Sequence, residues 1–129
     1  MPLKDELAER VSRLAEEAWE IADGRVVPST DTGASGIRID ACALYADIHK
    51  STEMVDTLSD TRAAETYKCF LYCAAKNVLS NNGEIAAYDG DRIMAIYVRN
   101  DQADRAIKTA LELNYAVKEI INPAFANVY

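Results

Sequence analysis

The stretch Ile37 to Thr52, IRIDACALYADIHKST, decides how the chain folds. It starts with alternating apolar and polar residues and becomes continuously apolar in ACALYA, a pattern typical of a central strand covered on both faces. The apolar run stops at Asp47. Because the Ser51 or Thr52 hydroxyl can cap a helix, the sequence predicts a strand over 37–48 that leads into a helix start.

The later elements are predicted from hydrophobic spacing and turn residues. A helix over about Ser59 to Leu79 carries an apolar stripe and stops at a Ser-Asn-Asn-Gly turn. Two short strands, Glu84 to Tyr88 and Arg92 to Val98, form a hairpin around a tight turn. A last helix runs over about Gln102 to Ile121, and Pro123 helps to terminate it.

This order of elements predicts an α+β domain with a ferredoxin-like split βαβ sheet, the palm-type arrangement. The third strand of such a sheet inserts between the first two and runs antiparallel to both. Asp47, at the end of the first strand, then lies beside Asp91 in the hairpin turn. The chain stops where a fourth strand is expected, which favours a fragment lacking C-terminal strands, because the shortened sheet would have an open edge.

The residues before the sheet are predicted to form a helix and a loop. Apolar residues recur at steps of three and four through residues 1–24, which indicates an amphipathic helix. The apolar stripe of this helix is too short to hold a coiled-coil dimer by itself. The helix could therefore either pack on the sheet domain or pair with the same helix of a second copy. Residues 25–36 are rich in Ser, Thr, Asp and Gly and predict an exposed loop, which leaves 37–129 as the sheet domain.

Composition and charge narrow the possible functions. The chain has 129 residues, of which 50% are hydrophobic and 27% charged, as in one globular domain. Its formal net charge of −7 argues against duplex nucleic acid as a partner, because backbone phosphates require a cationic face. Three cysteines without framework spacing indicate reduced thiols. Since neither a signal-peptide core nor a membrane-spanning apolar run is found, a cytoplasmic protein without a membrane span is expected.

Asp47 and Asp91 indicate the chemistry of a site. Two carboxylates held close together repel each other unless they share a cation, and oxygen ligands favour Mg²⁺ or Mn²⁺ over zinc. Backbone amides at a helix start over His49 to Thr52 can receive the phosphate oxygens that such an ion neutralises. On this pattern alone the simpler alternative is favoured, in which Asp47 merely ends a strand and residues 89–91 merely make a turn.

Two motifs resemble the signatures of the class III nucleotidyl cyclases, which include the catalytic domains of adenylate and guanylate cyclases. Leu44 to Thr52, LYADIHKST, is similar to the first signature, an apolar strand that ends in Asp-Ile and a short turn that closes with Thr. Tyr88 to Tyr97, YDGDRIMAIY, is similar to the second, a strand followed by Gly-Asp and an apolar strand. The resemblance covers about Ile37 to Ile121 and favours the metal site over the simpler alternative.

The resemblance implies two-metal conversion of a nucleoside triphosphate into its 3′,5′-cyclic monophosphate and pyrophosphate. Asp47 and Asp91 would bridge two Mg²⁺ or Mn²⁺ ions, and the backbone carbonyl of Ile48 would complete the shell. Cyclases of this family work as dimers with sites across the interface, so a homodimer is implied. The residues implied to bind phosphate are His49, Lys50, Ser51 and Thr52.

The sequence also departs from the family. Ala87 stands at the base-specificity position, four residues before the second Asp, where adenylate cyclases place a lysine. This fits a pyrimidine substrate, UTP or CTP, and resembles the short bacterial anti-phage cyclases of the Pycsar type, which make cyclic UMP or cyclic CMP. The alternatives are an adenylate cyclase that reads its base through other residues, and a non-catalytic cyclase-like module for nucleotide sensing or dimerisation.

Four further residues have competing interpretations. Lys50 stands where the family commonly has Gly, and could supply a local cation or be a solvated lysine. His49, the single histidine, could act as a general base, which metal activation makes unnecessary. Cys69 and Cys73 could bind a soft metal with His49, but packing as small buried residues is favoured. Asp89 could join the metal shell, but forming the turn is favoured.

Overall fold

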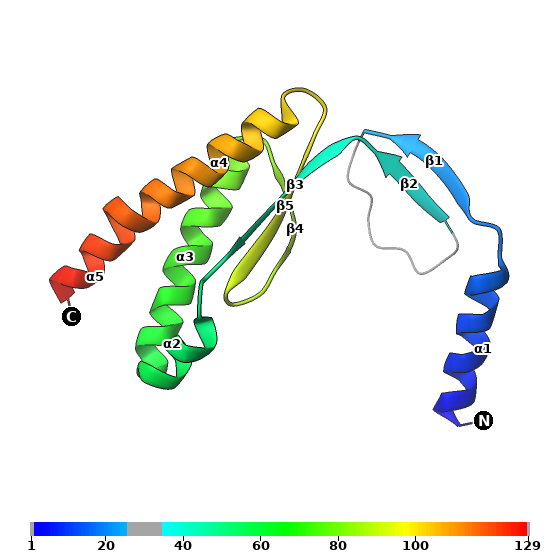
Figure 1. Ribbon diagram of the computed structural model, residues 1–129, viewed down its shortest axis with the longest axis horizontal. Helices are drawn as coiled ribbons and strands as arrows, with labels where there is room; N and C mark the ends of the chain where they lie inside the picture. The colour runs from blue at the N-terminus through cyan, green and yellow to red at the C-terminus, as the bar shows by residue number, and fades with distance from the viewer. Residues whose placement is uncertain (1, 26–34, 129) are drawn as a thin grey trace. The chain divides into compact units, whose positions relative to one another are not determined.

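The structure, a computed structural model, describes residues 2–25 and 35–128, which divide into two compact units. The boundary between the units falls between Asp40 and Ala41. The first unit contains α1 (Leu3–Glu16), β1 (Glu20–Gly24) and β2 (Ser35–Ile39) (Figure 1).

The first unit differs from the helix and loop expected there. The helix ends at Glu16, because Glu17 already has extended backbone, and residues 20–24 form β1 instead of continuing the helix to residue 24. β1 pairs in parallel with β2, and this ladder supplies the backbone hydrogen bonds that a longer helix would have made internally. The loop was expected to extend to residue 36, but β2 already starts at Ser35. Residues 26–34 of the expected loop lie outside the described parts of the chain.

The strand expected over 37–48 is two strands, because its halves find different partners. Residues up to Ile39 pair with β1, whereas the apolar run from Ala41 pairs with β5. The second compact unit therefore starts at Ala41, four residues later than the sheet domain expected from Ile37.

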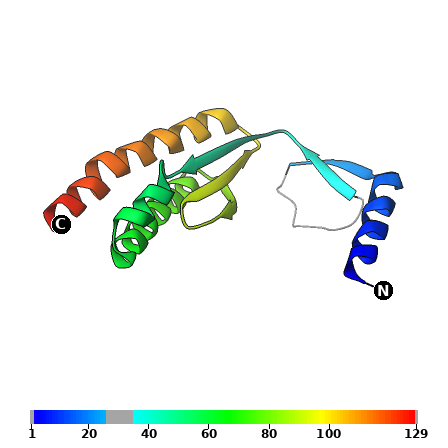
Figure 2. The ribbon, with the colours of Figure 1, turned by 60° about the horizontal axis from the view of Figure 1, so that its bottom comes forward.

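The second unit contains the sheet predicted from the sequence. β5 lies between β3 and β4 and is antiparallel to both, so the predicted strand order is confirmed. Figure 2 shows β3 beside the hairpin of β4 and β5. The elements of this unit are β3 (Ala41–Asp47), α2 (Ser51–Thr57), α3 (Asp60–Ser80), β4 (Glu84–Tyr88), β5 (Arg92–Val98), α4 (Gln102–Ala116), the π-helical η1 (Val117–Ile121) and α5 (Asn122–Val128).

The core lies between the sheet and the helices α3 and α4. It is formed mainly by apolar side chains of β5, α3 and α4, with Ala95 and Tyr97 of β5 fully buried. Burial alternates along β3, so Leu44 packs on this core while Tyr45 is 65% exposed. The expectation that β3 is a central strand covered on both faces is therefore wrong, because in the described part of the unit β3 is the edge strand of a three-stranded sheet.

The C-terminal helix extends beyond the predicted stop at Pro123. Between α4 and α5 the backbone widens into one π-helical turn, in which Asn122 N–H bonds to Val117 O. Proline lacks an N–H, and its ring clashes with a carbonyl of the preceding turn in a regular helix. The wider turn relieves this conflict, so the helix continues to Val128. Among the described residues, no helix is both long and apolar enough to cross a lipid bilayer.

Candidate active site

The topology brings Asp47 and Asp91 to the same end of the sheet. Asp47 is the last residue of β3 and lies opposite Arg92, the first residue of β5. One residue further along, the Ile48 N–H donates to the Asp91 carbonyl oxygen at 2.8 Å. The two acidic residues therefore lie on adjacent chain segments, as the split βαβ topology predicts.

The hairpin that carries Asp91 is closed by a tight turn. The Asp89 N–H donates to the Arg92 carbonyl oxygen at 2.9 Å, and the Arg92 guanidinium lies 3.5 Å from the Asp89 carboxylate. The prediction that Asp89 forms the turn is confirmed. Arg92 was overlooked in the sequence; it pairs with Asp47 across the strands, while its guanidinium lies beside the Asp89 carboxylate.

The turn after β3 places Ser51 and Thr52 differently from the capping role expected for them. Lys50 is the residue before α2, in the left-handed conformation with φ 56° and ψ 43°, and no side chain caps this helix. Ser51 is already the first helical residue, and its hydroxyl donates to Asp91 Oδ2 at 2.8 Å. Ser51 is therefore one position too late to act as the N-cap, and its hydroxyl proton forms a charge-assisted hydrogen bond across to the hairpin.

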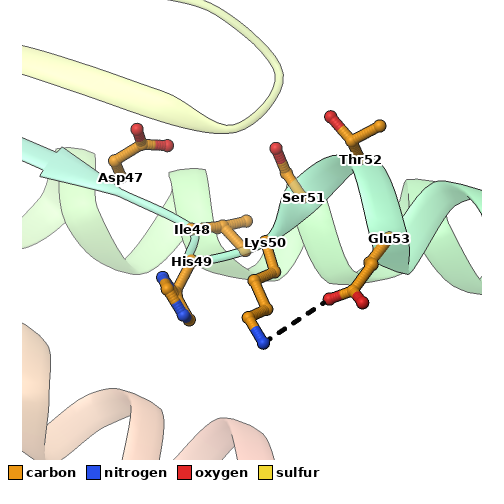
Figure 3. A pocket seen from close by; sticks show the side chains of 7 residues that line it. All are labelled: Asp47, Ile48, His49, Lys50, Ser51, Thr52 and Glu53. Atoms are coloured by element: carbon orange, nitrogen blue, oxygen red, sulfur yellow. Dashed lines mark ion pairs between the residues drawn. The ribbon is translucent and has the colours of Figure 1, made fainter.

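An open cavity of about 570 Å³ lies along this turn and is lined by residues Asp47 to Glu53. In Figure 3 the side chains of Asp47, Ser51 and Thr52 point to one side of the turn, and those of His49, Lys50 and Glu53 point to the other. Lys50 Nζ lies 3.8 Å from Glu53 Oε2 on that second side. Of the four residues implied to bind phosphate, only two therefore direct their side chains to the side that carries Asp47.

A smaller cavity of about 270 Å³ touches the same turn from the helices. Asp47, Ile48 and His49 line it together with Phe70 of α3 and, from the C-terminal helical segment, residues Val117, Ile121, Asn122 and Phe125. Its lining is largely apolar. The larger cavity differs from it, because charged and hydroxyl-bearing side chains make up most of its lining.

The donor atoms at the site fit a hard divalent cation. Asp47 and Asp91 offer carboxylate oxygens and Ile48 a backbone carbonyl, the ligand types that Mg²⁺ and Mn²⁺ prefer. In residues 2–25 and 35–128, no three His, Cys, Asp or Glu side chains are grouped so as to hold a metal ion. Protein carboxylates here would thus supply part of a coordination shell, as in magnesium sites that substrate phosphates complete.

The cysteines do not assemble a soft-metal site with His49 in the described part of the chain. Cys73 packs against the core, and burial raises the pKa of its thiol, with a further contribution from the neighbouring Cys69. A raised pKa disfavours the thiolate that would bind metal. Both side chains are half-buried, which agrees with packing as small residues.

Ala87 lies on the same face of the sheet as Asp47, in the neighbouring set of cross-strand partners. It is exposed on β4 and pairs with Met94 of β5, which pairs in turn with Tyr45 of β3. These three side chains form a row across the sheet, next to the row of Asp47 and Arg92. Tyr45 was overlooked in the sequence, although period-two alternation places residue 45 on the same strand face as Asp47.

Comparison with known proteins supports the motif resemblance. No family model matches the chain. The chain is 40% identical over 127 residues to a uridylate cyclase of Xanthomonas perforans, covering 95% of this chain and 55% of the relative. It is 37% identical to a uridylate cyclase of Burkholderia cepacia, covering 98% and 57%, and 31% identical to one of Rhodovulum sp. (strain MB263), covering 100% and 55%. The resemblance to nucleotidyl cyclases is confirmed.

The fold agrees with this relationship to the cyclases. A solved bacterial light-regulated adenylyl cyclase superposes with a TM-score of 0.60 at 20% identity, over 64% of this chain and 42% of the other. The α+β class III cyclase fold is therefore shown for the superposed part. The chain spans little more than half the length of the uridylate cyclases that it matches.

Proposed function

We propose that this protein is a nucleotide cyclase that converts a pyrimidine nucleoside triphosphate, UTP in preference to CTP, into the 3′,5′-cyclic monophosphate and pyrophosphate. The observation that carries the proposal is the hydrogen bond from the Ile48 N–H to the Asp91 carbonyl oxygen, which joins the segment that follows Asp47 to Asp91, with an open cavity along the turn from Asp47 to Glu53. The substrate preference is supported by three relatives named uridylate cyclase, at 31% to 40% identity.

Asp47, Asp91 and the Ile48 carbonyl are the proposed ligands of two Mg²⁺ or Mn²⁺ ions. Bound there, such ions would lower the pKa of the ribose 3′-hydroxyl and neutralise the triphosphate. The two carboxylates are the catalytic residues in this proposal, because they concentrate negative charge where the cations are needed. The reaction forms a bond between the 3′-oxygen and the α-phosphorus and releases pyrophosphate, so no external oxidant or reductant is required.

The turn from His49 to Thr52 is the proposed triphosphate site. The Thr52 hydroxyl lies on the Asp47 side of this turn, and the backbone N–H groups of the first helical turn lack intrahelical acceptors. His49 and Lys50 point away from Asp47, so a phosphate contact from Lys50 requires its side chain to leave Glu53. The exposed ion pair with Glu53 is weak enough for this exchange.

The base is proposed to lie over the row of Ala87, Met94 and Tyr45. Ala87 offers neither charge nor length to read a purine edge, whereas Tyr45 presents a largely exposed aromatic ring on which a flat pyrimidine can stack.

A cyclase homodimer with sites across its interface would cover this face. By the resemblance to the anti-phage cyclases, the cyclic nucleotide would serve as a second messenger in antiviral defence.

The test is to incubate the full-length protein with ATP, GTP, CTP or UTP and Mn²⁺ and to identify the products by mass. Cyclic UMP with an equal amount of pyrophosphate is the expected result. Cyclic AMP as the sole product would overturn the pyrimidine preference. Absence of cyclic product from all four nucleotides would overturn the enzymatic proposal in favour of a nucleotide-sensing or dimerisation module.

A further inference from the structure

Asp91 is held from two directions by the segment that follows Asp47. The Ile48 N–H bonds to its carbonyl oxygen at 2.8 Å, and the Ser51 hydroxyl bonds to its Oδ2 atom at 2.8 Å. Ser51 and Asp91 are both half-buried, so water competes less for this bond than at a fully exposed pair. The main chain and the side chain of Asp91 are thus both tied to the segment that carries the other carboxylate.

The Ser51 bond also limits what the Ser51 hydroxyl can do for a nucleotide. A serine hydroxyl has one proton to donate, and an ionised carboxylate is an acceptor only. While Ser51 donates to Asp91 Oδ2, it has no proton for a phosphate oxygen. The Oδ1 atom and the remaining lone pairs of the carboxylate stay available to a cation.

The backbone of the turn directs Ser51 towards the hairpin. Lys50 adopts left-handed backbone, which L residues with a side chain seldom adopt, and Ser51 begins the helix directly after it. The side chain of Ser51 lies on the same side of the turn as Asp47, towards the β4–β5 hairpin (Figure 3). A strained conformation that persists at a candidate site indicates that the surrounding contacts require it.

We propose that Ser51 is a positioning residue, whose hydroxyl fixes the Asp91 carboxylate beside Asp47 for a divalent cation and does not bind phosphate. This assignment narrows the phosphate-binding set to the other residues of the turn. It rests on the proposed function for its catalytic consequence, but the effect on cation binding can be measured without turnover. Groups that orient metal ligands by hydrogen bonds raise metal affinity, because the ligand is already ordered before the ion arrives.

The test measures Mn²⁺ binding to the full-length protein without nucleotide, by the EPR signal of the free hydrated ion. Ser51→Ala is expected to weaken Mn²⁺ binding about 10-fold, and Ser51→Thr, which keeps the hydroxyl, to restore most of it. The control is Thr57→Ala, which removes a hydroxyl from the same helix, where it bonds only to backbone carbonyls of α2. Thr57→Ala is expected to leave Mn²⁺ binding unchanged.

A second measurement separates positioning from phosphate binding. With a fluorescent, non-cyclisable UTP analogue at saturating Mn²⁺, Ser51→Ala is expected to bind nucleotide as tightly as the wild type. Weaker nucleotide binding with unchanged Mn²⁺ affinity would make Ser51 a phosphate ligand and overturn the assignment. Unchanged Mn²⁺ affinity and unchanged nucleotide affinity would overturn it as well. Should Ser51→Ala not fold, Ser51→Thr and Ser51→Val are compared, because they match in shape and differ only in the hydroxyl.

The outcomes distinguish this assignment from the proposed function. Loss of Mn²⁺ affinity in Ser51→Ala, from a wild type that makes no cyclic nucleotide, would support the positioning role and reject the cyclase. Cyclic UMP from a wild type whose Mn²⁺ affinity does not depend on Ser51 would support the cyclase and reject the positioning role. A wild type that binds no Mn²⁺ would reject the positioning role.

Discussion

The polar groups at the two ends of β5 differ in their exposure and in their hydrogen-bond partners. Directly before the first residue of β5, Asp91 accepts hydrogen bonds from the Ile48 N–H and the Ser51 hydroxyl, and the segment from Asp47 to Glu53 lines an open cavity. At the other end of β5, the fully buried Tyr97 donates to Thr109 Oγ1 at 2.7 Å, and Asn81 donates to the same oxygen at 3.0 Å. One end leaves charged groups available for ligands, whereas the other satisfies its polar groups internally.

Arg105 completes the internally satisfied end. It donates to the carbonyl oxygens of Asn81, Asn82, Asn100 and Val98, and its guanidinium lies 5.6 Å from the centre of the Tyr97 ring. Helix α4 is thereby tied to the loops on either side of the hairpin strands. The comparison predicts that substitutions at the Asp91 end change activity, while those at the Tyr97 end change stability.

The largest effect is expected for Asp47→Asn and Asp91→Asn. Each change removes a charge that the proposed cations require, so cyclic nucleotide formation should fall at least about 100-fold, the upper end of the loss seen when only a supporting group is removed. Thermal unfolding should be nearly unchanged, because these residues lie outside the core. Product formation by mass spectrometry checks this prediction, and near-normal turnover in either variant would contradict it.

At the opposite end, Thr109→Val should destabilise the fold by about 2 kcal/mol. It removes the acceptor of Tyr97 and Asn81 while keeping the side-chain shape, and a buried polar group left without a partner costs roughly 1–3 kcal/mol. Urea unfolding gives the free-energy difference, and Thr109→Ser, which keeps the hydroxyl, is the control. If turnover at low temperature fell with stability unchanged, the contrast between the two ends would be wrong.

Tyr45→Ala tests whether the open face of the sheet contributes to substrate binding. Loss of the ring should raise KM for UTP about 10-fold, since stacking of one base on an aromatic side chain is worth roughly 1–3 kcal/mol. Steady-state kinetics at saturating Mn²⁺ measure the change, with Tyr45→Phe as the variant that retains the ring. Equal KM values for all three proteins would exclude stacking on Tyr45.

Lys50→Gly tests the backbone strain at Lys50, near the Asp91 end of β5. Left-handed backbone costs an L residue roughly 1–2 kcal/mol, a cost that glycine does not have. Glycine instead loses more conformational entropy on folding than lysine does, which costs roughly 0.5–1 kcal/mol. A net stabilisation of about 0.5 kcal/mol is therefore expected from denaturant unfolding. Lys50→Ala, which keeps a side chain in the left-handed turn, should show no such gain; equal stabilisation of both variants would show that the lysine charge matters instead.

The smallest effect concerns the pH dependence of stability at the Tyr97 end. Burial raises the pKa of Tyr97 above its ordinary value of 10.0, so the folded state retains this proton more strongly than the unfolded state. Its stabilising contribution is complete below pH 10 and is lost as pH rises through the folded-state pKa. Urea unfolding from pH 9 to 11 should show a smaller loss of stability in Tyr97→Phe than in the wild type. The same dependence of unfolding free energy on pH in both proteins would contradict a raised pKa for Tyr97.

Much of the sheet was predictable because its signals are local. The hairpin strands Glu84–Tyr88 and Arg92–Val98 have the predicted bounds, since period-two alternation around a turn defines a strand pair within a few residues. The segment before Ala41 was not predictable in this way. Ile37 and Ile39 alternate as a strand does, but alternation does not say which partner strand supplies the hydrogen bonds.

Sequence alone determined the hairpin strands and their turn, because hydrophobic period and turn chemistry are properties of short segments. The order of the elements along the chain then predicted the split βαβ topology, which brings Asp47 and Asp91 to adjacent chain segments. Tertiary structure decided which hydroxyl holds which carboxylate. Ser51 could have capped its own helix, and only the approach of the β4–β5 turn offered it the Asp91 carboxylate. Tertiary structure also decided that the side chains of His49 and Lys50 lie on the side of the turn opposite to Asp47.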